Sequence, residues 1–219
     1  MKTFSILALL SITLSCSQTQ ENFSVVSSLP GNIKEASACE ISKSSPLIWT
    51  VEDHNNRNVL FGFNEKGELV KEITITNVKN NDWEDLTSDD EGNLYIGDFG
   101  NNDNDRENLA IYKINAADLN KNEAKAESIV QFYYPEQTEI PSKKKNRIFD
   151  VESFLIHNNK FYLFTKNRSS KFDGTTVLYE VENNSTQKLA ASKIGSFVTC
   201  EEFNHCAVTS ADISPNKDK

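Results

Sequence analysis

The chain has 219 residues, of which 37% are hydrophobic and 25% are charged, so it is long enough to form one soluble domain with a substantial core. Its formal net charge is −9, with 32 Asp and Glu residues against 23 Lys and Arg residues. Such an acidic surface argues against nucleic acid or anionic lipid bound through a basic patch, and we expect no nucleic-acid partner.

The N-terminus has the pattern of an export signal. Lys2 precedes an apolar stretch over residues 4–14, which is too short to span a bilayer as a helix. Ser15 then stands directly before Cys16, and polar residues follow at once. This arrangement resembles the signal of bacterial lipoproteins, although Thr13 stands where that signal usually has Leu, Val or Ile.

The resemblance implies cleavage before Cys16 and lipidation of its thiol, which would anchor the protein to a membrane. We therefore expect a signal peptide over residues 1–15, a tether over 16–30 and an exported protein of the bacterial cell envelope. The alternative is an ordinary secretory signal in which the cysteine is incidental.

One pattern recurs along residues 31–219: a strand with an acidic first residue, a turn, and a second apolar strand. It is complete at residues 82–98 and 150–166, partial at 35–52, and begins again near residue 208. Repetition about every 50 to 70 residues indicates an array of similar supersecondary units.

Each unit contains four predicted strands joined by short turns rich in Asn and Gly. The predicted strands cover 35–42, 47–52, 58–64 and 68–76; 83–89, 93–98, 108–114 and 127–134; and 150–156, 160–166, 175–182 and 187–195.

Repeated four-stranded antiparallel units predict an all-β protein with a β-propeller fold. A β-sandwich is the alternative, but a sandwich needs no internal repeat. Three blades and the start of a fourth do not close a ring, so we expect a C-terminally truncated piece of a longer propeller that occupies residues 31–219. Closure by oligomerisation is the alternative.

Acidic residues head the first strands and follow the second strands of the predicted blades. Residues i and i+2 of a strand point to the same side, so Asp82 pairs with Glu84, and Asp150 pairs with Glu152. In a propeller these groups and Asp98 would gather at one mouth of the central channel.

A ring of carboxylates suits Ca²⁺ or Mg²⁺, so we predict a metal site made by Glu84, Asp98 and Glu152, with Ca²⁺ as the candidate cofactor. The alternative is structural, because acids at strand starts also cap backbone N–H groups and tie neighbouring blades together.

Three cysteines follow the signal. Cys200 and Cys206 are close enough in sequence to form a disulfide, which an oxidising exported compartment permits. Two reduced thiols, or a zinc site that includes His205, are the alternatives. Cys39 occupies a position that is apolar in the other units and is expected to be buried.

The segments 82–85, 95–102, 150–152 and 163–167 resemble those of exported bacterial β-propeller lipoproteins. More distantly, the chain is similar to the esterase-like phytase and gluconolactonase groups of six-bladed propellers. That resemblance implies a calcium site in the channel, to which Glu84 and Glu152 would contribute; the remaining ligands would lie in blades that this chain lacks.

These observations leave two functional hypotheses. The first is a binding or scaffold module of the cell envelope, whose partner is an envelope protein or a small molecule. The second is a divalent-cation-dependent hydrolase of phosphate esters or lactones. No nucleophile motif is present, and His54 beside Asp53 is the only histidine placed to act as a general base.

Overall fold

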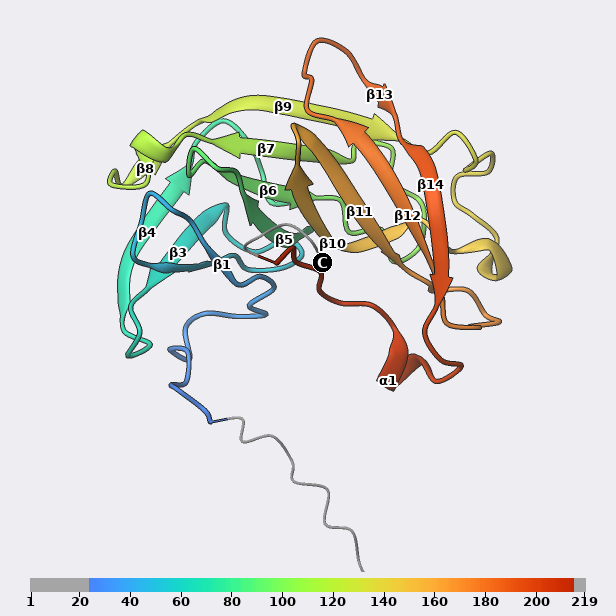
Figure 1. Cartoon of the computed structure of the whole chain (residues 1–219), viewed down its shortest axis with the longest axis horizontal. Coiled ribbons are helices and arrows are strands. Elements are labelled where there is room, and N and C mark those ends of the chain that lie inside the picture. The colour runs from blue at the N-terminus through green and yellow to red at the C-terminus, as the bar shows by residue number, and fades with distance from the viewer. Residues whose placement is uncertain (1–23, 215–219) are drawn as a thin grey trace, which may run out of the picture.

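The structure is a computed structural model and describes residues 24–214. Strands dominate this part of the chain and form three sheets that follow one another around an arc (Figure 1). The sheets lie side by side, and the first strands of the second and third sheets pack against each other on the inner side of the arc.

Each sheet is built on an antiparallel meander of four strands. The first contains β1 (Glu40–Ile41), β2 (Ile48–Thr50), β3 (Val59–Phe63) and β4 (Leu69–Ile75); the second contains β5 (Trp83–Ser88), β6 (Leu94–Asp98), β7 (Ala110–Ile114) and β9 (Ala126–Tyr133); the third contains β10 (Asp150–His157), β11 (Lys160–Lys166), β12 (Thr175–Glu182) and β14 (Ser192–Val198). The protein is therefore all-β with a β-propeller-like fold, as predicted, and each meander is one blade.

Two short strands link neighbouring blades at their outer edges. The strand β8 (Glu123–Ala124), from the second unit, pairs in parallel with β4 of the first blade. In the same way β13 (Leu189–Ala190), from the third unit, pairs in parallel with β9 of the second blade. Each donated strand satisfies backbone groups that the outer edge of the blade would otherwise leave unpaired.

The prediction of one continuous strand over residues 187–195 is therefore wrong. Ala191 is buried between β13 and β14, and its N–H donates to the carbonyl oxygen of Tyr133 at 2.8 Å. The apolar pattern runs through both strands, so only the pairing with the preceding blade shows where one ends and the next begins.

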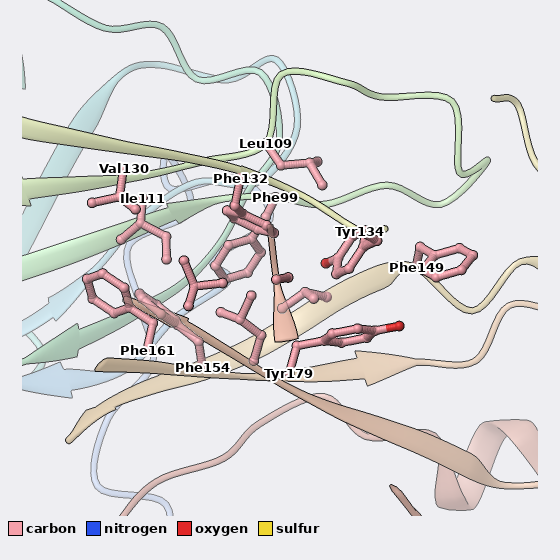
Figure 2. Close-up of a cluster of buried hydrophobic side chains, with 14 of the residues drawn as sticks. Phe99, Leu109, Ile111, Val130, Phe132, Tyr134, Phe149, Phe154, Phe161 and Tyr179 are labelled. Carbon is pink, nitrogen blue, oxygen red and sulfur yellow. The ribbon is translucent and has the colours of Figure 1, made fainter. Parts of the chain in front are cut away.

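Aromatic side chains fill the space between the second and third blades (Figure 2). Phe99 packs edge-to-face on Phe154, with ring centroids 5.1 Å apart, and Tyr134 contacts Tyr179 at 4.8 Å. A second cluster, which includes Trp49 and Trp83, packs the first blade on the second. These clusters fix the inner strands β5 and β10 beside each other, which is the arrangement that a shared site requires.

The segments that flank the blades contain little regular structure. Short 3-10 helices cover Ala116–Asp118 and Lys144–Asn146, and the helix α1 covers Phe203–Cys206. Residues 207–214, where the fourth unit was expected to begin, form no strand. The predicted signal peptide and Cys16 lie outside the described residues. No helix among residues 24–214 is long and apolar enough to cross a membrane.

The structure pairs Cys200 with Cys206, whose Cα atoms are 5.4 Å apart, and this bond closes the loop that carries α1. Cys39 is exposed, so the expectation that it is buried is wrong. It lies just before the two-residue strand β1, at the open edge of the first sheet.

We expect the disulfide to contribute about 2 kcal/mol, because a bond across so short a loop restricts the unfolded chain modestly. Urea unfolding of the variant with both Cys200→Ser and Cys206→Ser should show this loss, whereas Cys39→Ser should unfold like the parent. Titration of the unfolded parent that shows free thiols at Cys200 and Cys206 would contradict the pairing.

Candidate metal centre at the inner rim

Two glutamates occupy equivalent β-bulges at the start of the inner strands. In the second blade the register passes from Trp83↔Asp98 to Asp85↔Gly97, which leaves Glu84 as the extra residue. In the third blade it passes from Val151↔Thr165 to Ser153↔Phe164, which leaves Glu152 as the extra residue. Bulges redirect side chains and are common beside active sites.

The bulges bring carboxylates from all three blades together. Asp53, Asp82 and Glu84 each offer one oxygen atom within 4.8 Å of the others, and so do Glu84, Asp150 and Glu152. Glu84 belongs to both groups and lies at the centre of the rim. We call these five residues the rim carboxylates. The structure thus brings Glu84 and Glu152 together, and that they bind a metal stays a prediction.

The half of the rim that belongs to the third blade is already neutralised. The Nε atom of Arg168 donates to Asp150 at 2.6 Å, and its Nη2 atom donates to Glu152. The ammonium group of Lys166 donates to the second oxygen of Glu152 at 3.0 Å, and the backbone N–H of Asn101 donates to Asp150 at 2.7 Å. All four oxygens of this carboxylate pair therefore have donors.

In the other half of the rim, fewer positive groups offset the negative charges of Asp53 and Asp82. Asp82 lies 3.1 Å from Nδ1 of His54 and 3.9 Å from Arg106, and burial raises its pKa to about 6 although these two groups lower it. Asp53 is half-buried, and its side chain accepts from the backbone N–H of His54 at 2.5 Å. Arg106, at 3.9 Å, is the nearest lysine or arginine to Asp82 among residues 24–214, and none of these residues forms a salt bridge with Asp53.

Among the rim carboxylates, Glu84 has the fewest groups that could stabilise its negative charge. Its side chain is 7% exposed and has neither a hydrogen bond nor a salt bridge with any described residue. Burial first, and then the charges of Glu152, Asp53, Asp150 and Asp82, raise its pKa to about 10. A buried carboxyl group of this kind either holds a proton or needs a bound cation.

Asp98, the third predicted ligand, lies outside both groups. It is fully buried and accepts from Arg106 at 2.7 Å, from Tyr112 at 2.8 Å and from Asn81 at 2.6 Å. The backbone N–H of Asp82 also donates to it, at 3.1 Å. Asp98 therefore holds Asn81 and Asp82 in place just before β5, which is the structural role that the sequence left open.

The first blade departs from the pattern of the other two. Ser37 stands at the position of Glu84 and Glu152, and its hydroxyl donates to the backbone carbonyl of Glu84. Glu35, at the position of Asp82 and Asp150, is exposed and accepts from Asn56 at 2.9 Å. The first blade instead contributes Asp53, from the end of its second strand.

Gly100 has no side chain, and this leaves space for the carboxylates of Glu84 and Asp82. A Cβ atom on this residue would lie 2.2 Å from Oε1 of Glu84 and 2.5 Å from the carboxylate of Asp82. The position therefore admits no side chain unless both carboxylates move. Gly100 and Arg168 were not predicted as site residues, because neither belongs to the repeated pattern in the sequence.

We expect Gly100→Ala to weaken divalent-cation binding at the rim at least tenfold, because it displaces two carboxylates at once. Calorimetric titration with Ca²⁺ measures this effect. Gly195→Ala is the matched control, since a Cβ there meets nothing within 4 Å. Equal affinities for the two variants would exclude Glu84 and Asp82 as ligands.

The disulfide loop lies beside the same rim. Phe203 packs edge-to-face on Phe172, with ring centroids 5.3 Å apart. The ammonium of Lys166 lies 5.9 Å from the Phe203 ring centroid, and the guanidinium of Arg168 lies 5.8 Å from it. The loop therefore packs on the two cations that neutralise Asp150 and Glu152.

Fold and site together define a β-propeller-like protein with a carboxylate-rich inner rim. No family model matches the chain, and no curated protein is detectably similar in sequence. The similar solved structures include hydrazine synthase from Kuenenia stuttgartiensis, at 9% identity and a TM-score of 0.42, covering 90% of this chain and 43% of that one.

Two further similar structures come from Bacteroides. A protein of unknown function from Bacteroides caccae has 11% identity and a TM-score of 0.41, covering 83% of this chain and 50% of that one. A putative 6-phosphogluconolactonase from Bacteroides uniformis has 10% identity and a TM-score of 0.37, with coverages of 82% and 61%. The chain thus spans less than two thirds of each of these proteins, and likeness at this level identifies no family or activity.

Proposed function

We propose that this protein is an exported, lipid-anchored binding module of the bacterial cell envelope whose inner rim binds a divalent cation, with Ca²⁺ as the candidate. The observation that carries the cation site is Glu84, a buried carboxyl group at the centre of five carboxylates that has no hydrogen-bond or salt-bridge partner among residues 24–214. A bound dication would supply the missing counter-charge.

The group of Asp53, Asp82 and Glu84 is the better ligand set. Its oxygens lie within 4.8 Å of one another, a separation that ligands about 2.4 Å from one Ca²⁺ ion can have. Asp150 and Glu152 would add negative potential, but their own oxygens are engaged by Arg168 and Lys166. An all-carboxylate set favours a hard cation over zinc.

Calcium titration of the mature, chelator-treated protein tests the proposal. A ligand present at 100 times its dissociation constant stabilises the folded state by about 2.7 kcal/mol, so the melting temperature should rise by several degrees. Mg²⁺ should act more weakly, because it demands stricter octahedral geometry. Identical melting temperatures with Ca²⁺ and with chelator would contradict the proposed cation site.

A divalent-cation-dependent hydrolase is the second candidate, and the contact between His54 and Asp82 favours it. Asp82 orients the largely exposed ring through Nδ1, and the Asn55 side-chain amide lies 2.5 Å from Nε2. For His54 to act as a general base, a water molecule would have to replace this amide at Nε2. Turnover of phosphate monoesters and lactones with Ca²⁺, lost in His54→Ala but with cation binding retained, would support it. If no phosphate monoester or lactone is turned over, the hydrolase is excluded and the binding module remains the proposed function.

Export and anchoring rest on the sequence of residues 1–16. Cells that express the whole chain and are fed a labelled fatty acid should incorporate the label into the parent protein, and Cys16→Ser should abolish incorporation. An unlabelled parent protein released in soluble form would instead support an ordinary secretory signal.

A further inference from the structure

A cavity lies at the opposite end of the inner strands from the rim carboxylates. It has a volume of about 480 Å³ and is bordered by the first turns of the three blades and by residues 212–214. The strand β5 runs from the rim at Glu84 to the cavity at Ser88, a distance of roughly 13 Å. The two sites are therefore separate, and this volume suits a small organic ligand.

The wall of this cavity carries more negative charge than its own lysines neutralise. Five carboxylate residues line it: Glu40, Asp89, Asp90, Glu91 and Asp212. Its two ammonium groups are engaged, because Lys43 pairs with Asp90 at 2.5 Å and Lys113 pairs with Glu127 at 2.9 Å.

Glu40 and Asp212 have no cationic partner among the described residues, although they belong to segments that are far apart in sequence. The hydroxyl of Ser88 donates to Glu40 at 2.5 Å, and the backbone N–H of Ile213 donates to Asp212 at 2.7 Å. Burial raises the pKa of Glu40 to about 7, and the charge of Asp212 adds to this shift, so the two carboxylates repel each other across the cavity. A positively charged ligand would relieve that repulsion.

The shape of the cavity distinguishes a metal ion from a larger cation. No three carboxylate oxygens of its lining lie within 4.8 Å of one another, whereas the rim contains two such sets among residues 24–214. The remaining wall offers amide groups of Asn158, Asn159 and Asn183. Separated charges and amide walls suit several amino groups on a flexible chain better than one ion.

We propose that this cavity binds a small organic cation with two or more amino groups, held between the carboxylates of Glu40 and Asp212. The amides of the turn at Asn158 and Asn159 would accept hydrogen bonds from the ligand. This site is independent of the cation site at the rim, and its failure would leave that proposal intact.

Calorimetric titration of the mature protein with spermidine, in the presence of saturating Ca²⁺, tests the inference. Two ion pairs of this exposure are together worth about a tenfold change in affinity, so the double variant Glu40→Gln and Asp212→Asn should bind spermidine about tenfold more weakly. The double variant Glu65→Gln and Glu107→Gln removes two exposed carboxylates outside the cavity and should bind like the parent. Cooperative thermal melting of both double variants, at melting temperatures close to that of the parent, would show that they are folded.

Three results would overturn the proposal. The first is the absence of spermidine binding by the parent protein. The second is an equal loss of affinity in the two double variants, which would show that only net charge matters. The third is loss of spermidine binding in Glu84→Gln, which would place the amine at the rim.

Discussion

Replacing Glu84 with Gln is expected to stabilise the cation-free protein at pH 8 and, at the same time, to abolish its stabilisation by Ca²⁺. The variant loses a buried carboxyl group whose pKa is raised to about 10 and keeps a side chain of the same shape. At pH 8 the unfolded chain has released this proton, so holding it costs the folded state about 5 kcal/mol, most of which Gln removes.

The sign of the pH dependence follows from the same shift. The folded state binds the Glu84 proton more tightly than the unfolded chain does, so the penalty appears as pH rises above the unfolded pKa and grows until the folded pKa is reached. Without Ca²⁺, the free energy of unfolding should therefore fall between about pH 5 and pH 9 in the parent protein. The fall should be smaller in Glu84→Gln; part of it remains, since the pKa values of Asp82 and Asp150 are also raised.

Urea unfolding across this pH range, with Ca²⁺ and with chelator, measures both effects. Glu65→Gln, in an exposed hairpin turn, is the control and should retain the pH dependence and the calcium response of the parent. A variant at Glu84 that still responds to Ca²⁺ would show that the ion binds elsewhere. A variant that is less stable at pH 8 would show that Glu84 has a partner.

Replacing Arg168 with Gln should have the largest destabilising effect at the rim. The change leaves the fully buried Asp150 without a salt bridge to any described residue, and it leaves Glu152 paired with Lys166. Removal of one partner from a buried ion pair costs about 3–5 kcal/mol, because a charge remains in a medium of low dielectric constant. Calorimetric melting should show a fall of about 6–20 °C in the melting temperature of a domain of this size.

Two further measurements separate this electrostatic cause from a general packing defect. The stability of Arg168→Gln should recover partly at pH 5, where the rim carboxylates take up protons, since burial and the charge of Glu152 already raise the pKa of Asp150 to about 7 in the parent. Added Ca²⁺ should also stabilise this variant more than it stabilises the parent. Lys143→Gln, which breaks an exposed pair with Glu139, should change stability by no more than about 0.5 kcal/mol.

The sequence predicted the blades well because a blade is a local structure. Alternating apolar residues and turn-forming Asn and Gly residues set the meanders of the second and third units to within two residues at most strand ends. The exceptions are the two donated strands β8 and β13, which pair with the preceding blade. Such pairing depends on two outer edges meeting in space, and no periodicity within one segment records it.

At the rim, too, the sequence predicted features that depend on nearby residues and missed those that depend on tertiary contacts. The repeat in the sequence identified Glu84 and Glu152 as equivalent residues, and the two bulges confirm that equivalence. It placed Asp98 in the same set, whereas the structure surrounds Asp98 with donors from its own blade and the following loop. A strand pattern specifies which side a residue faces but not which donors arrive from elsewhere.

The sequence alone was enough to predict the order of strands within each meander, the repeated unit and the acidic residues at the start of β5 and β10, because each of these depends on residues close together in the chain. Only the tertiary structure decided which carboxylates are neutralised and which are not. Arg168 reaches the acids of its own blade, while Glu84 is buried among the charges of all three blades without a donor. That difference arises from packing between blades, and it is what makes Glu84 the centre of the proposed site.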